Sequence, residues 1–170
     1  METKFNTYLR IRPVLQSEIA QGGYTQCIAS KGKIAYITKD NAAIVIDPTK
    51  GIVDNDKITS CTFDHVFDMG SQQADVFGKI GVPSVEHVLK GYNVTLFAYG
   101  QTATGKTYTM EGTPAPDGRG LGRRILESLF EKIDQLDSNN KVYLNLSITQ
   151  IYNEDVYDLL SPTAAKVKLR

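Results

Sequence analysis

The chain has 170 residues, which is enough for one domain with a buried core. Hydrophobic residues make up 41% of it and charged residues 22%, which is typical of a globular protein. Its 19 basic and 19 acidic residues cancel, so the charge gives no indication of a nucleic-acid partner. No run approaches the roughly 18 apolar residues of a membrane span, and the N-terminus lacks the apolar core of a signal peptide.

The N-terminal part of the chain has the pattern of short strands. Residues 7–12 alternate in polarity and end at Pro13, which predicts a strand, and the polar residues 14–21 predict a turn or a short helix. Turn residues separate the short runs that follow, which predicts a small antiparallel meander. These runs are 24–29, 33–38 and 42–46, and residues 58–67 are a further strand candidate.

A helix with internal breaks is predicted next. Ser71 has the character of an N-cap, and apolar residues recur at roughly helical spacing from 72 to 90. Gly78, Gly81 and Pro83 lie inside this stretch, so we expect the helix to be weakened or kinked.

The second half of the chain alternates between strand and helix patterns, which indicates an α/β protein. A run rich in proline and glycine, 112–120, interrupts one of the helical stretches. The expected elements are a strand at 93–99, a helix at 121–136, a strand at 142–151, a short helix at 154–160 and the beginning of a strand at 166–170.

Residues 100–107 read Gly-Gln-Thr-Ala-Thr-Gly-Lys-Thr, which matches the phosphate-binding pattern GxxxxGK[ST] at its four fixed positions. The predicted strand before the pattern and the helical stretch after it are the context that the pattern requires. Glycine lacks a Cβ and lets the backbone curl around an anion, lysine adds a mobile charge, and the last hydroxyl can bind Mg²⁺. The alternative is a flexible glycine turn between a strand and a helix that binds no ligand. We therefore predict a nucleotide site made of Gly100, Gln101, Thr102, Ala103, Thr104, Gly105, Lys106 and Thr107, with Thr107 as the magnesium ligand.

The cysteines and histidines form no metal or nucleophile pattern. Cys27 and Cys61 each lie in a strand-like segment, which predicts buried free thiols and fits a reducing compartment. His65 and His87 are isolated in the sequence, and we expect structural or exposed roles for them.

Four separated segments resemble the kinesin motor domain. They are LRIRP at 9–13, FDHVF at 63–67, GYNVTLFAYGQTATGKTYTMEG at 91–112 and ITQIYNEDVYDLL at 148–160, in the family's order and at its usual intervals. The resemblance implies that residues 1–170 are a partial motor domain, its nucleotide-binding half. The implied fold is of the P-loop NTPase type: a mixed, mainly parallel central sheet flanked by helices, incomplete, with a small antiparallel meander near the N-terminus.

The resemblance also implies that the glycine loop holds the phosphates of ATP or ADP together with Mg²⁺. Arg10, Arg12 and Pro13 match the family's adenine-side residues, and Tyr108 stands where the family often has a ring that stacks on the base. Without the resemblance, both arginines would be read as an ordinary charged strand face. Ala103 departs from the Gly or Ser that is usual in this loop.

The function implied is ATP hydrolysis coupled to movement along microtubules, in the cytoplasm at the cytoskeleton. The family's two switch segments, of the types NxxSSRSH and DxAGSE, and its main microtubule-contacting elements lie downstream of residue 170, so we assign no catalytic residue. We expect weak binding of Mg-nucleotide and poor hydrolysis by this chain. Two alternatives stay open: a non-catalytic motor-like module that binds a protein partner, and an unrelated P-loop kinase or NTPase.

The central sheet should be left with gaps. In kinesins later strands lie between the strands that match 7–12 and 93–99, and between those that match 93–99 and 142–151. Unpaired backbone edges are costly and recruit other chains. We therefore expect a rearranged sheet, self-association, or pairing with the missing C-terminal half.

Overall fold

The structure is a computed structural model, and it describes residues 5–22, 25–38, 46–47, 51–52, 58–136, 141–163 and 166–167. The chain forms two compact units, Met1–Phe130 and Glu131–Arg170, which are taken separately below. In the part of the chain that is described, no helix is long and apolar enough to cross a membrane.

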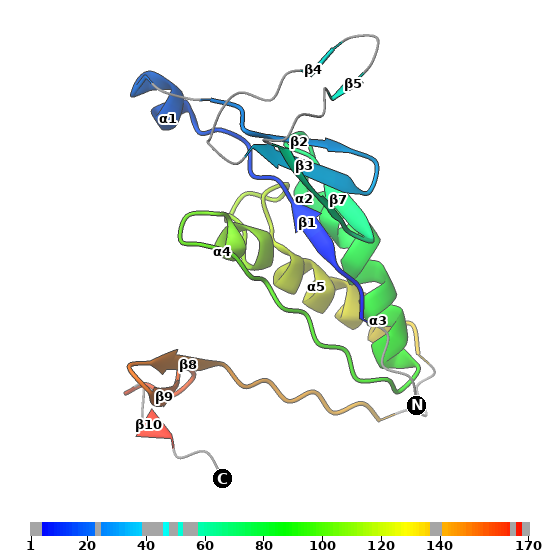
Figure 1. The fold of residues 1–170 in the computed structure, drawn as a ribbon. Coiled ribbons are helices and arrows are strands. Elements are labelled where there is room, and N and C mark those ends of the chain that lie inside the picture. Colours follow the sequence, from blue (N-terminus) through cyan, green and yellow to red (C-terminus); the bar gives the residue numbers. More distant parts are fainter. Residues whose placement is uncertain are drawn as a thin grey trace. The chain divides into compact units, whose positions relative to one another are not determined.

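A short parallel pair of strands lies at the centre of the first unit. Strand β1 (Tyr8–Arg10) pairs with β7 (His65–Phe67), as Figure 1 shows, and this confirms the strand predicted at the N-terminus. The predicted strand 58–67 is instead two strands in two different sheets. The change of direction between them is held by Asp64, whose carboxylate accepts hydrogen bonds from the backbone N–H (2.7 Å) and the hydroxyl (3.0 Å) of Thr7.

An antiparallel meander is present as predicted, but its third strand comes from the candidate at 58–67 and not from the run at 42–46. It consists of β2 (Ile28–Lys31), β3 (Ile34–Thr38) and β6 (Ile58–Thr62), in the spatial order β2-β3-β6. Gly32, with φ +61°, makes the turn between the first two strands, a conformation that glycine adopts without strain. The run predicted at 42–46 lies mostly outside the described residues, apart from the two-residue strand β4 (Ile46–Asp47), which pairs with β5 (Gly51–Ile52).

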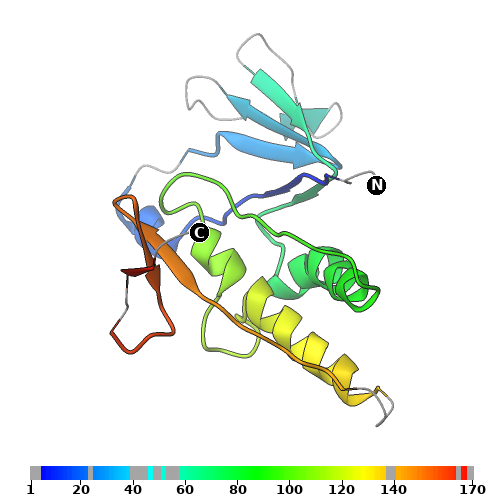
Figure 2. The ribbon, with the colours of Figure 1, turned by 90° about the horizontal axis from the view of Figure 1, so that it is seen from below.

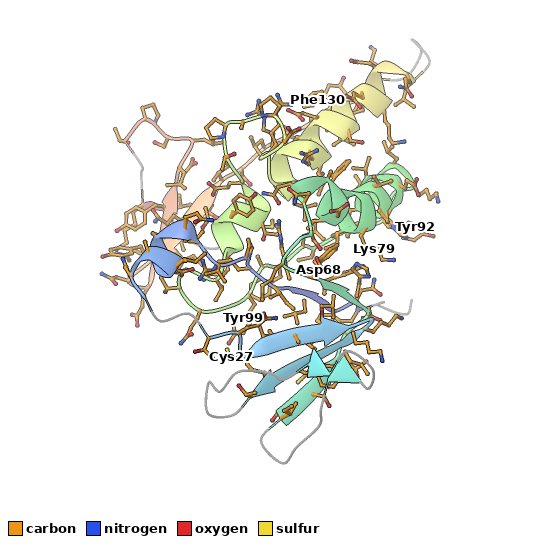
Figure 3. The ribbon with its side chains drawn as sticks, turned by 90° about the horizontal axis from the view of Figure 1, so that it is seen from above. Cys27, Asp68, Lys79, Tyr92, Tyr99 and Phe130 are labelled. Carbon is orange, nitrogen blue, oxygen red and sulfur yellow. The ribbon has the colours of Figure 1, made fainter. Side chains whose placement is uncertain are left out.

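The expectation of buried thiols is wrong. Cys27, labelled in Figure 3, is half-buried, and Cys61 is exposed because most of β6 faces solvent; both are free. The histidines have structural neighbours: the ring of His65 lies edge-on to Phe67 at 4.6 Å, and His87 donates to the Pro83 carbonyl at 2.6 Å.

The helix expected from 72 to 90 is present, and its α-helical geometry is interrupted in the stretch that contains Gly78 and Gly81. Its second part is a π-helical turn, and π-turns bend helices because their backbone bonds span one residue more. A Cβ on Gly81 would lie 2.3 Å from the Phe77 ring, so only glycine fits this turn. The N-cap is Gln72 rather than the predicted Ser71, whose hydroxyl is bonded to Asp68 instead. The three parts are α2 (Gln73–Val76), η1 (Phe77–Gly81) and α3 (Val82–Leu89).

Two more helices follow the glycine loop, interrupted where the sequence predicts. Helix α4 (Lys106–Met110) and helix α5 (Leu121–Asp134) are joined by a loop that folds back on itself, with the Gly120 N–H bonded to the Glu111 carbonyl at 2.9 Å. The apolar core includes Val76 and Val85, each 1% exposed. Full burial of such side chains contributes about 1.5–3 kcal/mol each.

Residues 92–99 do not form the predicted strand. They run from α3 to the glycine loop without a strand partner among the described residues, and Figure 1 draws them as a green coil without an arrow. Phe97 and Tyr99 are 84% and 89% exposed, and Figure 3 shows the position of Tyr99. A strand requires a hydrogen-bonded neighbour, and the described part of the chain supplies none for this segment.

The second unit contains an antiparallel sheet in the order β10-β9-β8, visible in Figure 2. Residues 141–148 precede it without a strand partner in the described chain, so the strand predicted at 142–151 is present only in its last part. The short helix predicted at 154–160 is wrong. Asn153 (φ +48°) and Glu154 (φ +67°) form a tight left-handed turn, which favours a hairpin over a helix. The strands are β8 (Thr149–Tyr152), β9 (Asp155–Asp158) and β10 (Lys166–Val167).

Candidate functional site

The glycine loop has the curled backbone that a phosphate site requires. Gly100 (φ +155°), Ala103 (φ +65°) and Gly105 (φ +96°) all have positive φ, and α4 begins directly after the last of them. A Cβ on Gly100 would lie 2.6 Å from the Thr104 hydroxyl, so the loop closes on itself where glycine leaves room. The Thr104 hydroxyl in turn donates to the Gln101 carbonyl at 2.7 Å, which holds the turn.

Several backbone donors of this loop are free. The first intrahelical bond of α4 runs from the Thr109 N–H to the Gly105 carbonyl at 2.8 Å. The four preceding N–H groups, from residues 105–108, have no hydrogen-bond acceptor in the described part of the chain. A left-handed glycine followed by successive unpaired N–H groups is the donor arrangement that recognises phosphate.

Lys106 places its charge beside the same loop. Its Nζ donates to the carbonyls of Gly100 (2.9 Å) and Gln101 (2.7 Å), and the side chain is half-buried. Carbonyls are weak partners for an ammonium group compared with a phosphate, which carries full negative charge. Thr107 is exposed, and its hydroxyl has no partner among the residues that are described, so it is available as a metal ligand. These residues fit a Mg-nucleotide.

Arg12 lies against the loop. Its Cγ and Cδ are the atoms nearest to the position of a Cβ on Gly105, at 4.0 and 3.9 Å, so the arginine stem contacts the loop's second glycine. Its guanidinium makes a bidentate pair with Glu18, at 2.6 and 3.1 Å, and this hydrogen bonding raises the pKa of Arg12. Arg12 and the exposed Pro13 also line a cavity of about 350 Å³.

Arg10 contacts α4 itself, through Tyr108 and Thr109. Its Nη1 donates to the Thr109 hydroxyl at 3.0 Å and to the Gln73 carboxamide oxygen at 2.8 Å, and its Cζ lies 5.2 Å from the centre of the Tyr108 ring. Burial lowers the pKa of Arg10, but an arginine remains charged at neutral pH. The structure thus brings two of the predicted base-side residues, Arg10 and Tyr108, into one cation–π contact beside the glycine loop.

Gln73 was missed by the sequence reasoning. It is 2% exposed, and it also donates to the carbonyls of Tyr108 (2.6 Å) and Gly118 (3.3 Å). The only available signal was a polar residue on the apolar side of the 72–90 pattern, one turn before Phe77.

The strained Ala103 gives the first prediction. Left-handed backbone costs an L-residue about 1–2 kcal/mol, whereas glycine adopts it freely. We expect Ala103→Gly to raise the free energy of unfolding by about 1 kcal/mol in urea denaturation. Ala74→Gly, in the helical part of α2, is the matched control and should lower it by about 1 kcal/mol. If both variants lowered the free energy of unfolding equally, the backbone at residue 103 would carry no strain.

The Arg12–Glu18 pair gives a prediction on pH. The hydrogen bonds from Arg12, and then from the Leu15 backbone N–H, lower the pKa of Glu18 from its usual 4.5. A carboxyl group whose pKa is lower in the folded state stabilises the fold at pH values above its pKa in the unfolded state. This stabilisation is lost as the pH falls through the pKa of the folded state. A ¹³C NMR titration of the Glu18 carboxyl should show a midpoint below 4.5. Arg12→Leu should move the midpoint back towards that value, and an unchanged midpoint would refute the pairing.

Comparisons with known proteins identify the family of this chain. The family model of the kinesin motor domain matches residues 10–170. The kinesin heavy chain of Neurospora crassa is 48% identical over 105 residues, which are 61% of this chain and 11% of that protein. Kinesin-related protein 3 of Dictyostelium discoideum is 34% identical over 165 residues, which are 95% of this chain and 13% of that protein.

A solved structure gives the same result for the fold. It is described as "Structure of a fast kinesin: Implications for ATPase mechanism and interactions with microtubules", and it matches with a TM-score of 0.76 and 36% identity. The match covers 94% of this chain and 41% of the solved one. The fold is therefore that of a P-loop NTPase, mixed and incomplete, as the sequence predicts. The chain belongs to the kinesin motor domain family, and it spans well under half the length of the relatives that it matches.

Proposed function

We propose that residues 1–170 are the nucleotide-binding part of a microtubule-based motor ATPase. The observation that carries this proposal is the curled loop 100–107, in which the free N–H groups of residues 105–108 and the Lys106 ammonium lie together. ATP or ADP is proposed as the nucleotide, and the microtubule as the partner, because the chain belongs to the kinesin motor domain family.

Each part of the site has a role in this proposal. The residues of the loop, Gly100–Thr107, hold the phosphates, with Lys106 moving from the loop carbonyls to the phosphate oxygens. Thr107 is the ligand for Mg²⁺, which neutralises phosphate charge when bound. Arg10, Arg12, Pro13 and Tyr108 form the base side, where a guanidinium and a ring give a planar base something to stack on.

Hydrolysis and movement are proposed for the complete domain. Turnover also requires groups that hold the magnesium shell and orient the attacking water, and no residue of this chain is assigned to that task. The chain alone should bind Mg-nucleotide weakly and hydrolyse it poorly. Tubulin would be contacted mostly by elements outside residues 1–170, at the cytoskeleton, and neither a nucleic acid nor a membrane enters the proposal.

The test has two arms. Calorimetric titration with ADP in Mg²⁺, and then in EDTA, should show saturable binding that weakens when the metal is removed. The chain extended to a complete motor domain should hydrolyse ATP faster when microtubules are added. Binding without microtubule-stimulated hydrolysis would favour a non-catalytic motor-like module, and phosphoryl transfer to another acceptor would favour an unrelated P-loop kinase.

A further inference from the structure

The buried carboxamide of Gln73 connects three elements beside the proposed nucleotide site. Its oxygen accepts from Arg10 on β1 at 2.8 Å, and its nitrogen donates to the Tyr108 carbonyl in α4 at 2.6 Å and to the Gly118 carbonyl at 3.3 Å. The residue itself is 2% exposed, so a lost bond could not be replaced by bulk water.

Chemistry allows this group in only one orientation. A guanidinium only donates and the two backbone carbonyls only accept, so the carboxamide oxygen must face Arg10 and the NH₂ must face Tyr108 and Gly118. Glutamate at this position would keep the acceptor for Arg10 but turn an oxygen towards the carbonyls. An apolar residue would satisfy none of these groups.

The groups that Gln73 holds are those of the base side. Arg10 is fixed by Gln73 and by the Thr109 hydroxyl while it lies 5.2 Å from the Tyr108 ring centre. Tyr108 is held through its own backbone carbonyl, and the residue remains 44% exposed, so it is accessible to a ligand. The phosphate loop has no hydrogen bond to Gln73 among the described residues.

We propose that Gln73 is a positioning residue for the nucleotide base: its carboxamide sets the Arg10 guanidinium and the Tyr108 ring in the arrangement that a base stacks against. This inference rests on the proposed function. It separates base recognition from phosphate recognition, because the first depends on the Gln73 carboxamide. The second depends on Lys106 and on the N–H groups of residues 105–108, none of which bonds to Gln73.

The test compares a ligand with a base and one without, ADP and inorganic pyrophosphate, each with Mg²⁺. In the full chain, Gln73→Met should weaken ADP binding by about tenfold, the scale of a lost stacking and cation–π arrangement, and leave pyrophosphate binding unchanged. Gln135→Met, at an exposed glutamine, is the matched control and should change neither. Gln73→Glu, which keeps the acceptor for Arg10, should give a smaller loss for ADP.

A double-mutant cycle shows whether Gln73 acts through Arg10. Arg10→Lys alone should lower the ratio of ADP to pyrophosphate affinity, and adding Gln73→Met should lower it little further. Independent, additive effects would overturn the inference. So would equal weakening of both ligands with a lower melting temperature in Gln73→Met and Gln73→Glu, which would assign Gln73 to the fold alone. If the unmodified chain binds neither ligand, the proposed function itself fails, and this inference fails with it.

Discussion

Lys106→Ala is expected to lower the affinity for Mg-ADP by about a hundredfold. An opposite charge pair about 4 Å apart, at an effective dielectric near 20, is worth roughly 4 kcal/mol before desolvation is subtracted. In the ligand-free chain the ammonium is bonded to the Gly100 and Gln101 carbonyls, and these two bonds are given up on binding. A net loss near 3 kcal/mol remains, and about 1.4 kcal/mol corresponds to each tenfold change in affinity.

Isothermal titration calorimetry with ADP in excess Mg²⁺ measures this loss. Lys79→Ala is the matched control, because Lys79 is an exposed lysine on the helical segment α2–α3 and not on the loop (Figure 3). The control should bind as the unmodified chain does. Indistinguishable titration curves for Lys106→Ala and the unmodified chain would remove Lys106 from the site.

Supplying the remainder of a motor domain in trans is expected to protect residues 92–99 and 141–148 from hydrogen exchange. Neither segment has a strand partner in the described chain, and both expose large apolar side chains such as Phe97 (84%) and Tyr143 (83%). Strand addition would pair their N–H groups and cover those side chains. An amide that is paired in a sheet exchanges only after the sheet opens locally, which costs free energy that an unpaired amide does not need. We therefore expect hydrogen exchange in both segments to slow on the order of a hundredfold or more.

Co-expression with a C-terminal fragment, followed by exchange mass spectrometry, tests this expectation. Amides of β8 and β9, already paired with each other, serve as the internal reference and should change little. Without the fragment, self-association that grows with protein concentration should be visible by light scattering. A fragment that neither binds nor protects the two segments would count against an incomplete sheet.

Local chemistry made part of this fold predictable. The spacing of Gly100, Gly105 and Lys106 identifies the glycine loop, because each position meets a separate requirement of an anion site. An irregularity in the helix after α2 was predictable because glycine and proline weaken a helix whatever surrounds it. Arg10 and Tyr108 are far apart in the sequence. Their assignment to one site came from the resemblance to the family and not from a local pattern.

The errors arise where pairing decides the structure. The run 93–99 has strand composition, but composition does not supply a neighbouring strand. The predicted helix at 154–160 is a β-strand because the Asn153–Glu154 turn directs it back along β8. Gln73 escaped notice because its partners lie 35, 45 and 63 residues away, and nothing local indicates them.

The most direct test of the nucleotide site is a ¹⁵N–¹H NMR titration with Mg-ADP. We expect the largest amide shifts on residues 105–108, whose N–H groups are free in the described structure, and we expect Lys106→Ala to abolish these shifts. Shifts confined to the β2-β3-β6 sheet, with the loop amides unmoved, would contradict this expectation.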